Sequence, residues 1–326
     1  MSVVSNWRVA TSTLLLALAA LAVPGAVEAR ESLDDLYISS PLFKIEDVWP
    51  APETTPPAIE SFIQETEALP AENLPLLEPQ TPPLPPAFSV PAAAGPQDIV
   101  TEWGYGVREN KYNAAIFKAT DAWPHSDKVP LHPLLLKSLL ACESGFDPLA
   151  VSYTGAMGIA QLTPETARRF GLDWSSSRDP QRAIPAGVKV LAEKAQVVLY
   201  PGAYHKLMGL PPERCLYAQK VDAAYQSWGE PSVEQYWHLM LAAYNGGGGT
   251  ILRAMAVASD RGLDPREWSN LVGDSSNPQN TPLYLACREI FGRGAANKYR
   301  EVANYPLKVL KLYNKSVPAH HQVKLI

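Results

Sequence analysis

The chain has 326 residues, a hydrophobic content of 46% and a formal net charge of −5. This balance is typical of a globular protein that can bury a core and still have residues left for an extended segment. A nucleic-acid-binding protein would carry a basic stripe, which this sequence lacks, so no nucleic-acid partner is expected.

Residues 1–29 have the pattern of a cleavable secretory signal peptide. Arg8 gives the positive start, Thr11 to Val23 form a short apolar stretch, and Ala29 follows small residues at the cleavage positions. The stretch is short for a membrane span of about 17–25 residues, so no stable span is expected after cleavage. An uncleaved N-terminal anchor is the alternative. We therefore expect an exported protein of the periplasm.

Residues 30–97 form a predicted linker, largely disordered. Proline makes up about a quarter of the residues from Pro41 to Pro96, and acidic residues are scattered among them. Such a segment favours an extended polyproline conformation and cannot bury a core. It is either a solvated spacer or a strap that docks on a partner, such as envelope secretion or conjugation machinery.

Residues 98–315 form a predicted domain that is mainly α, with very little strand, followed by a C-terminal tail at 316–326. Proline, capping and glycine signals mark most of the helix ends. Weak strand signals are confined to the neighbourhood of Val151 to Gln161. The expected helices, in chain order, start after His132-Pro133 and stop at Gly145, run from Thr163-Pro164 to Phe170-Gly171, from Asp179-Pro180 to Leu199, from Ser232 to Asn245, from Thr250 to Ala258, and from Lys298 to Tyr313 with Pro306 inside.

Glu143 is the strongest candidate for chemistry. It follows Leu136, Leu139 and Leu140 at helical spacing, so it shares their apolar face at the last turn of a helix. Burial and the negative end of the helix dipole both disfavour the carboxylate, which raises the pKa of such a group. A carboxyl raised toward neutral pH can protonate a leaving oxygen. An exposed glutamate at a helix end is the alternative.

Other chemistries have weaker support. The histidines show no metal-ligand spacing, so neither a metal nor an organic cofactor is expected. Asp147, Asp173 and Asp179 are best read as cap or turn residues. Of the three cysteines, Cys142 lies beside Glu143 on a buried helix and is expected to stay free. A disulfide between Cys215 and Cys287 is the predicted pairing in an exported protein.

The chain resembles the soluble lytic transglycosylase family over about Leu134 to Leu312. These bacterial enzymes have a lysozyme-like helical fold and cleave peptidoglycan glycan strands. Four motifs occur in the family's order. They are Glu143-Ser144-Gly145-Phe146-Asp147-Pro148, Ser152 to Ala167, Ala242-Ala243-Tyr244-Asn245-Gly246-Gly247-Gly248, and the weaker Glu301-Val302-Ala303-Asn304-Tyr305-Pro306.

The resemblance implies a role for each matching position. Glu143 matches the catalytic acid and base, and Tyr244 matches the tyrosine that hydrogen-bonds its carboxyl. The remaining matches imply substrate-binding residues in or near the sugar groove, with Met157 at its floor; they are Ser152, Met157, Gln161, Asn245, Glu301 and Tyr305. Ala160 stands where the family usually has methionine, and the connection from Tyr200 to Pro231 is longer than usual, either a lid, a partner surface or an inert insertion.

The implied reaction is cleavage of the MurNAc–GlcNAc β-1,4 bond with formation of 1,6-anhydroMurNAc. One carboxyl group suffices, because the attacking hydroxyl belongs to the same sugar and benefits from a high effective molarity. Two rivals remain open. One is a goose-type lysozyme-like hydrolase of the same bond, which uses water; the other is an inactive glycan-binding scaffold protein.

Overall fold

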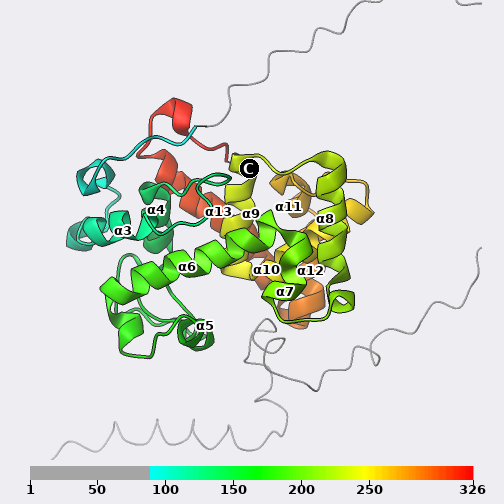
Figure 1. Ribbon diagram of the computed structural model, residues 1–326, viewed down its shortest axis with the longest axis horizontal. Coiled ribbons are helices and arrows are strands. Elements are labelled where there is room, and N and C mark those ends of the chain that lie inside the picture. Colours follow the sequence, from blue (N-terminus) through cyan, green and yellow to red (C-terminus); the bar gives the residue numbers. More distant parts are fainter. Residues whose placement is uncertain (1–88, 326) are drawn as a thin grey trace, which may run out of the picture. The chain divides into compact units, whose positions relative to one another are not determined.

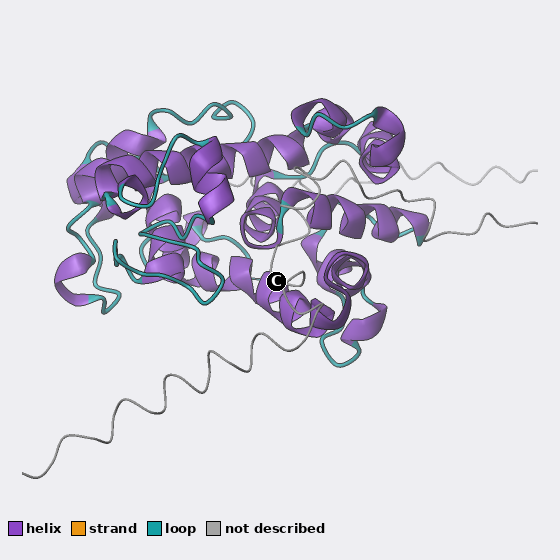
Figure 2. Cartoon of the chain, turned by 90° about the horizontal axis from the view of Figure 1, so that it is seen from below, coloured by secondary structure: helices purple, strands orange, loops and turns teal. Residues whose placement is uncertain are grey.

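A computed structural model describes residues 89–325 of the chain. The predicted signal peptide and residues 30–88 of the predicted linker lie outside the described residues. The described part consists of helices joined by loops (Figures 1 and 2). The α-helices are α3 Asn113–Thr120, α4 Pro133–Ser144, α5 Pro164–Arg169, α6 Pro180–Leu199, α7 Tyr204–Leu207, α8 Leu216–Trp228, α9 Val233–Gly246, α10 Gly248–Asp260, α11 Trp268–Val272, α12 Pro282–Phe291 and α13 Ala295–Asn314.

The local signals in the sequence placed six of these helices correctly. In α4 the His132 ring accepts a hydrogen bond from the Leu134 amide, and Gly145 ends the helix in the left-handed conformation with φ 60°. Thr163 caps α5 and Asp179 caps α6 through their side-chain oxygens. The helices α3, α7, α8, α11 and α12 were not predicted. Shorter 3-10 turns connect the helices.

Strand structure in residues 89–325 is limited to two isolated bridges in the loop after α4. Met157 pairs with Val151 on one side and with Leu162 on the other. The mainly α fold with very little strand is therefore confirmed. In the same range, none of the helices combines the length and the apolar character that a membrane crossing needs.

The helix α9 is the centre of the core. Trp237, Met240 and Leu241 on this helix are all at most 1% exposed. It packs against α6, α10 and α13, and α13 in turn packs against α4. Figure 1 shows α13 and α9 lying beside each other, with α4 on the far side of α13 from α8. This arrangement brings residues of α4, α9 and α13 together although they are far apart in the sequence.

The long connection from Tyr200 to Pro231 is an integral layer of the fold. It contains α7 and α8, and α8 packs against α10 with Val221 fully buried. The Tyr225 hydroxyl donates to the Val198 carbonyl at the end of α6, with an O–O distance of 3.0 Å. These contacts make α8 a supporting helix of the core.

Both ends of the described chain pack on the domain. Val90, inside the predicted linker, contacts the core, and Val323, inside the predicted tail, is 2% exposed. The side chain of Asn314 at the end of α13 holds the backbone of Val323 through two hydrogen bonds of 2.7 and 2.9 Å. Ser89 contacts His321 by a hydrogen bond of 3.2 Å. The folded unit therefore extends beyond residues 98–315 on both sides.

Candidate active site

Glu143 lies in the last turn of α4, half-buried, above the buried side chains of Leu136, Leu139 and Leu140. Burial, together with the smaller effect of the nearby Glu301 charge, raises the pKa of the Glu143 carboxyl to about 7. A hydrogen bond from Tyr305 and the charge of Lys298 act in the opposite direction. The group is therefore poised to exchange a proton near neutral pH.

The helix α13 supplies the polar partners of this carboxyl group. The Tyr305 hydroxyl donates to Glu143 Oε1 with an O–O distance of 2.5 Å. One turn earlier, Glu301 accepts a hydrogen bond of 3.0 Å from the Asn245 side chain. Lys298 donates to the Asn245 carbonyl at 3.0 Å and lies 3.5 Å from the Glu301 carboxylate. The structure thus brings together four residues that the sequence predicted for the site, namely Glu143, Asn245, Glu301 and Tyr305. Lys298 lies in the same group, although the sequence did not predict it.

The predicted hydrogen bond from Tyr244 to Glu143 is wrong. The Tyr244 hydroxyl donates to the Ala160 carbonyl at 2.9 Å, and Tyr305 takes the place expected for it. The reason is helix packing. The helix α9 places Tyr244 against α6 and the loop that contains Ala160, whereas α13 crosses α4 and brings Tyr305 to the Glu143 carboxyl. Tyr244 still lies close enough for the Glu143 charge to raise its pKa, although burial is the larger cause.

The loop from Val151 to Leu162 is tied to the end of α4. The Ser144 hydroxyl donates to the Ile159 carbonyl at 2.9 Å. Gln161, with a positive φ of 47°, donates from its side chain to the carbonyls of Ala150 at 3.2 Å and Gly158 at 3.0 Å. These bonds fix the loop next to Glu143 without using its carboxyl group.

Three predicted substrate-binding residues have structural roles inside this loop. The Ser152 hydroxyl accepts from the Ala156 amide at 2.9 Å and shares a hydrogen bond with Thr154. Met157 is only 3% exposed, so its side chain supports the loop from within. Gln161 has its amide nitrogen engaged by backbone carbonyls. No hydrogen bond among the described residues links Ser152 or Gln161 to Glu143.

Two close approaches hold the loop against the neighbouring segments. A Cβ atom on Gly187 of α6 would lie 3.0 Å from the Ala160 Cβ and 3.9 Å from the Tyr244 hydroxyl. Gly158 has φ 73°, and a Cβ there would lie 1.9 Å from the Ser177 carbonyl oxygen. The loop and α6 can therefore lie this close because position 160 is alanine and position 187 is glycine. Position 158 has no room for a side chain.

The other aspartates near the motif serve local structure, as predicted. Asp147 accepts from the Leu149 amide and pairs with Arg108 at 3.1 Å. Asp173 accepts from the amide and hydroxyl of Ser176, and Asp179 caps α6. Across residues 89–325, no cluster of His, Cys, Asp and Glu side chains is arranged to hold a metal ion.

The predicted disulfide is wrong, because both Cys215 and Cys287 are buried free thiols. They face different surroundings. The charges of Arg253 and Arg214 act on Cys215, whereas those of Lys298 and Glu301 act on Cys287. Cys142 is free, as expected. Spacing along the chain could not reveal that Cys215, just before α8, and Cys287, on α12, have different neighbours.

The chain is similar to a known protein family and to several curated proteins. The family model described as "Transglycosylase SLT domain" matches residues 125–265. This range contains Glu143, the loop and Tyr244, and it ends before α13. Glu301 and Tyr305 therefore lie outside the matched segment, where their placement rests on the tertiary structure.

Curated relatives include several named membrane-bound lytic murein transglycosylases. One, "F 1" from Alkalilimnicola ehrlichii, is 28% identical over 160 residues, covering 49% of this chain and 26% of the relative. Another, "F" from Maricaulis maris, is 31% identical over 52% of this chain and 30% of its own length. A third, "D" from Escherichia coli, is 27% identical over 48% of this chain and 28% of its own length. The similarity thus spans about a quarter to a third of each relative.

Proposed function

Through residues 125–265 the chain belongs to the transglycosylase SLT domain family, and from this premise we propose that it is a peptidoglycan lytic transglycosylase. The observation that carries the proposal is the single half-buried Glu143 carboxyl, whose pKa is raised to about 7 and which Tyr305 contacts. The names of the relatives support the same reaction class.

In the proposed reaction the protonated Glu143 gives its proton to the glycosidic oxygen between MurNAc and GlcNAc. The bond from that oxygen to C1 of MurNAc breaks, and GlcNAc leaves with a free 4-hydroxyl. The Glu143 carboxylate then takes the proton from the C6 hydroxyl of the same MurNAc, and the C6 oxygen bonds to C1. The product is 1,6-anhydroMurNAc, no water is consumed, and Glu143 ends protonated again.

The positions around Glu143 have complementary roles in this proposal. Tyr305 orients the carboxyl and stabilises its charged form between the two steps, because its hydroxyl donates to Oε1. The negative charge of Glu301 favours the protonated form that starts the reaction. Asn245 and Lys298 hold Glu301 in place. Ser152, Met157, Gln161 and Tyr244 act indirectly, by shaping the loop beside the glycan strand.

Product analysis tests the reaction. Sacculi digested with the protein should release muropeptides with anhydro ends, identified by a mass lower by one water than that of the reducing form. Glu143→Gln should remove this activity. Reducing ends would instead support a goose-type hydrolase, and wall lysis that survives in Glu143→Gln would overturn the assignment of the acid. A fully folded wild type that lyses no wall would support the glycan-binding scaffold.

We also propose that the protein acts in the periplasm and serves an envelope-spanning secretion or conjugation apparatus through residues 30–97. The proline-rich, acidic composition of this segment supports a tethering role. A crosslinking pull-down with the Pro41–Pro96 segment as bait should retrieve an envelope component. Retrieval equal to that of a scrambled segment of the same composition would contradict the tether.

A further inference from the structure

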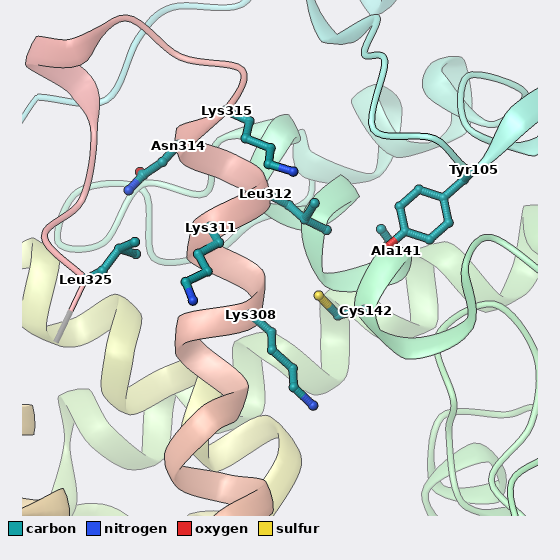
Figure 3. A pocket seen from close by; sticks show the side chains of 9 residues that line it. All are labelled: Tyr105, Ala141, Cys142, Lys308, Lys311, Leu312, Asn314, Lys315 and Leu325. Carbon is teal, nitrogen blue, oxygen red and sulfur yellow. The ribbon is translucent and has the colours of Figure 1, made fainter.

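A groove with a volume of about 600 Å³ lies between the end of α4 and the last turns of α13. Figure 3 shows Ala141, Cys142 and Tyr105 on one side, with Tyr105 beside Ala141, and the lysines of α13 on the other side. Leu312 adds to the apolar lining. An apolar floor edged by cations on one side is suited to a ligand that is both acidic and partly apolar.

The groove continues the candidate active site along α13. Positions 298, 301, 305, 308, 312 and 315 follow each other at spacings of three or four, so they form one stripe on this helix. Tyr305 on the stripe contacts Glu143, and Lys308 comes one turn later. Cys142, the neighbour of Glu143, lines the groove. The positive charge of Lys308 acts to lower the pKa of the Cys142 thiol, against the larger effect of burial. The groove lining is therefore one residue from the proposed acid on α4 and one turn from Tyr305 on α13.

The three groove lysines lack anionic partners within residues 89–325. Lys308, Lys311 and Lys315 are all exposed, and none of them forms an ion pair with a described Asp or Glu. Lys298, on the same stripe, is paired with Glu301. Three unpaired cations beside one groove attract anions and strengthen carboxylate binding where the floor excludes water.

We propose that this groove binds the acidic stem peptide carried by the muramic sugar that Glu143 acts on. The inference rests on the proposed function and names the part of the substrate that the groove recognises. From Lys308 to Lys315 the helix rises about 10 Å, and an extended peptide covers this distance in about three residues. Its carboxylates meet the lysines, while its small apolar side chains lie on Leu312 and Ala141.

Cleavage of paired substrates by the full chain tests the proposal. The substrates are glycan strands that keep their stem peptides and the same strands after an amidase has removed them. The wild type should cleave the stem-bearing strands with a kcat/KM about tenfold higher, which is the combined effect expected of three exposed charge pairs. The triple variant Lys308→Gln, Lys311→Gln, Lys315→Gln should lose this preference and keep its rate on bare strands.

Two controls isolate the effect of charge. Replacing the same lysines by arginine should retain the preference, because arginine also pairs with carboxylates. Lys189→Gln removes an exposed lysine of α6, outside the groove lining, and should change neither rate. Equal cleavage of both substrates by the wild type, or an unchanged preference in the triple glutamine variant, would overturn the assignment. Faster cleavage of both substrates by the triple glutamine variant would also overturn the assignment. It would indicate that the acidic residues 30–97 of the chain itself occupy the groove.

A binding measurement separates this inference from the proposed function. The free stem peptide is titrated into Glu143→Gln protein, with and without the three lysine substitutions. This measurement does not depend on catalysis. Lysine-dependent peptide binding, together with a folded wild type that cleaves no strand, would refute the proposed function and leave the groove assignment intact. Strand cleavage by the wild type, together with no peptide binding, would refute the groove assignment alone. Circular dichroism checks that each variant is folded.

Discussion

The Tyr305 hydroxyl and the Glu143 carboxyl form a 2.5 Å hydrogen bond across 162 residues of sequence. It joins the last turn of α4 to the middle of α13, where Glu143 is half-buried and Tyr305 is buried. Burial raises the pKa of both residues, and each affects the other: the tyrosine lowers the pKa of the acid, and the acid raises the pKa of the tyrosine. This pair sets the pH range in which the proposed acid can work.

The first prediction concerns the pH dependence of stability in Glu143→Gln. The carboxyl has a pKa of about 7 in the folded protein against 4.5 as its ordinary value, so the folded state binds the extra proton between these pH values. The contribution of Glu143 to the free energy of unfolding therefore falls as pH rises from 4.5 to 7, by about 3 kcal/mol. The neutral glutamine lacks this loss, so urea unfolding should find the variant more stable at pH 8 and little changed at pH 4.

An exposed carboxyl serves as the control for this measurement. Glu102→Gln makes the same substitution at an exposed carboxyl and is measured in parallel. Parallel stability curves for Glu143→Gln and the wild type over pH 4–8 would contradict a raised pKa of Glu143.

The second prediction separates the two site tyrosines. Tyr305→Phe removes the hydrogen bond that stabilises the Glu143 carboxylate, so the pKa of Glu143 should rise. The alkaline limb of the pH–rate profile should move up by about one unit, with a lower maximal rate because the carboxyl loses its orienting partner. Rates of anhydro-product release between pH 5 and 9 give the profile.

Tyr244→Phe is the matched variant of this prediction. It loses only the bond to the Ala160 carbonyl, so the alkaline limb should stay in place while the unfolding free energy falls by about 1 kcal/mol. If Tyr244→Phe moved the limb and Tyr305→Phe did not, the hydrogen-bond assignment in the structure would be wrong.

The third prediction concerns the glycines of the loop beside Glu143. Gly158→Ala should lower the unfolding free energy by more than 2 kcal/mol, because its Cβ would collide with the Ser177 carbonyl at a positive φ. Gly155→Ala has the same left-handed strain, with φ 86°, but open space around the new methyl group. It should cost only about 1 kcal/mol. Denaturant titrations of the two variants in parallel would refute the collision if the losses were equal.

The fourth prediction is that the protein contains three free thiols. Non-reducing mass mapping of the purified protein should find Cys142, Cys215 and Cys287 all unpaired. Thiol titration should find them slow to react in the folded state, since burial raises the pKa of Cys142 and of Cys287 to about 12. Recovery of a peptide linked through Cys215 and Cys287 would show instead that the helices can bring them together.

Much of the local structure could be predicted from the sequence because its causes are local. His132-Pro133 and Gly145 set the ends of α4, and Asp179-Pro180 sets the start of α6, through caps and backbone limits that neighbouring residues impose. The leucine spacing likewise placed Glu143 on the apolar face of its helix. By contrast, α8 starts without a side-chain cap, packs against α10 and was not predicted. The helix α12 was also not predicted, although Thr281-Pro282 at its start and Gly292 at its end give local signals like those of α5.

The sequence by itself determined the proposed acid, the loop that follows it and the helices that carry them, because spacing along a helix decides which side chains share a face. Only the tertiary structure decided which tyrosine contacts Glu143, that Cys215 and Cys287 stay apart, and that the lysines of α13 continue from the site into a groove. The tyrosine contact and the groove depend on how α4, α9 and α13 cross, and the cysteine separation depends on where α8 and α12 lie. Helix crossings are set by the packing of many side chains at once, and no short stretch of sequence records them.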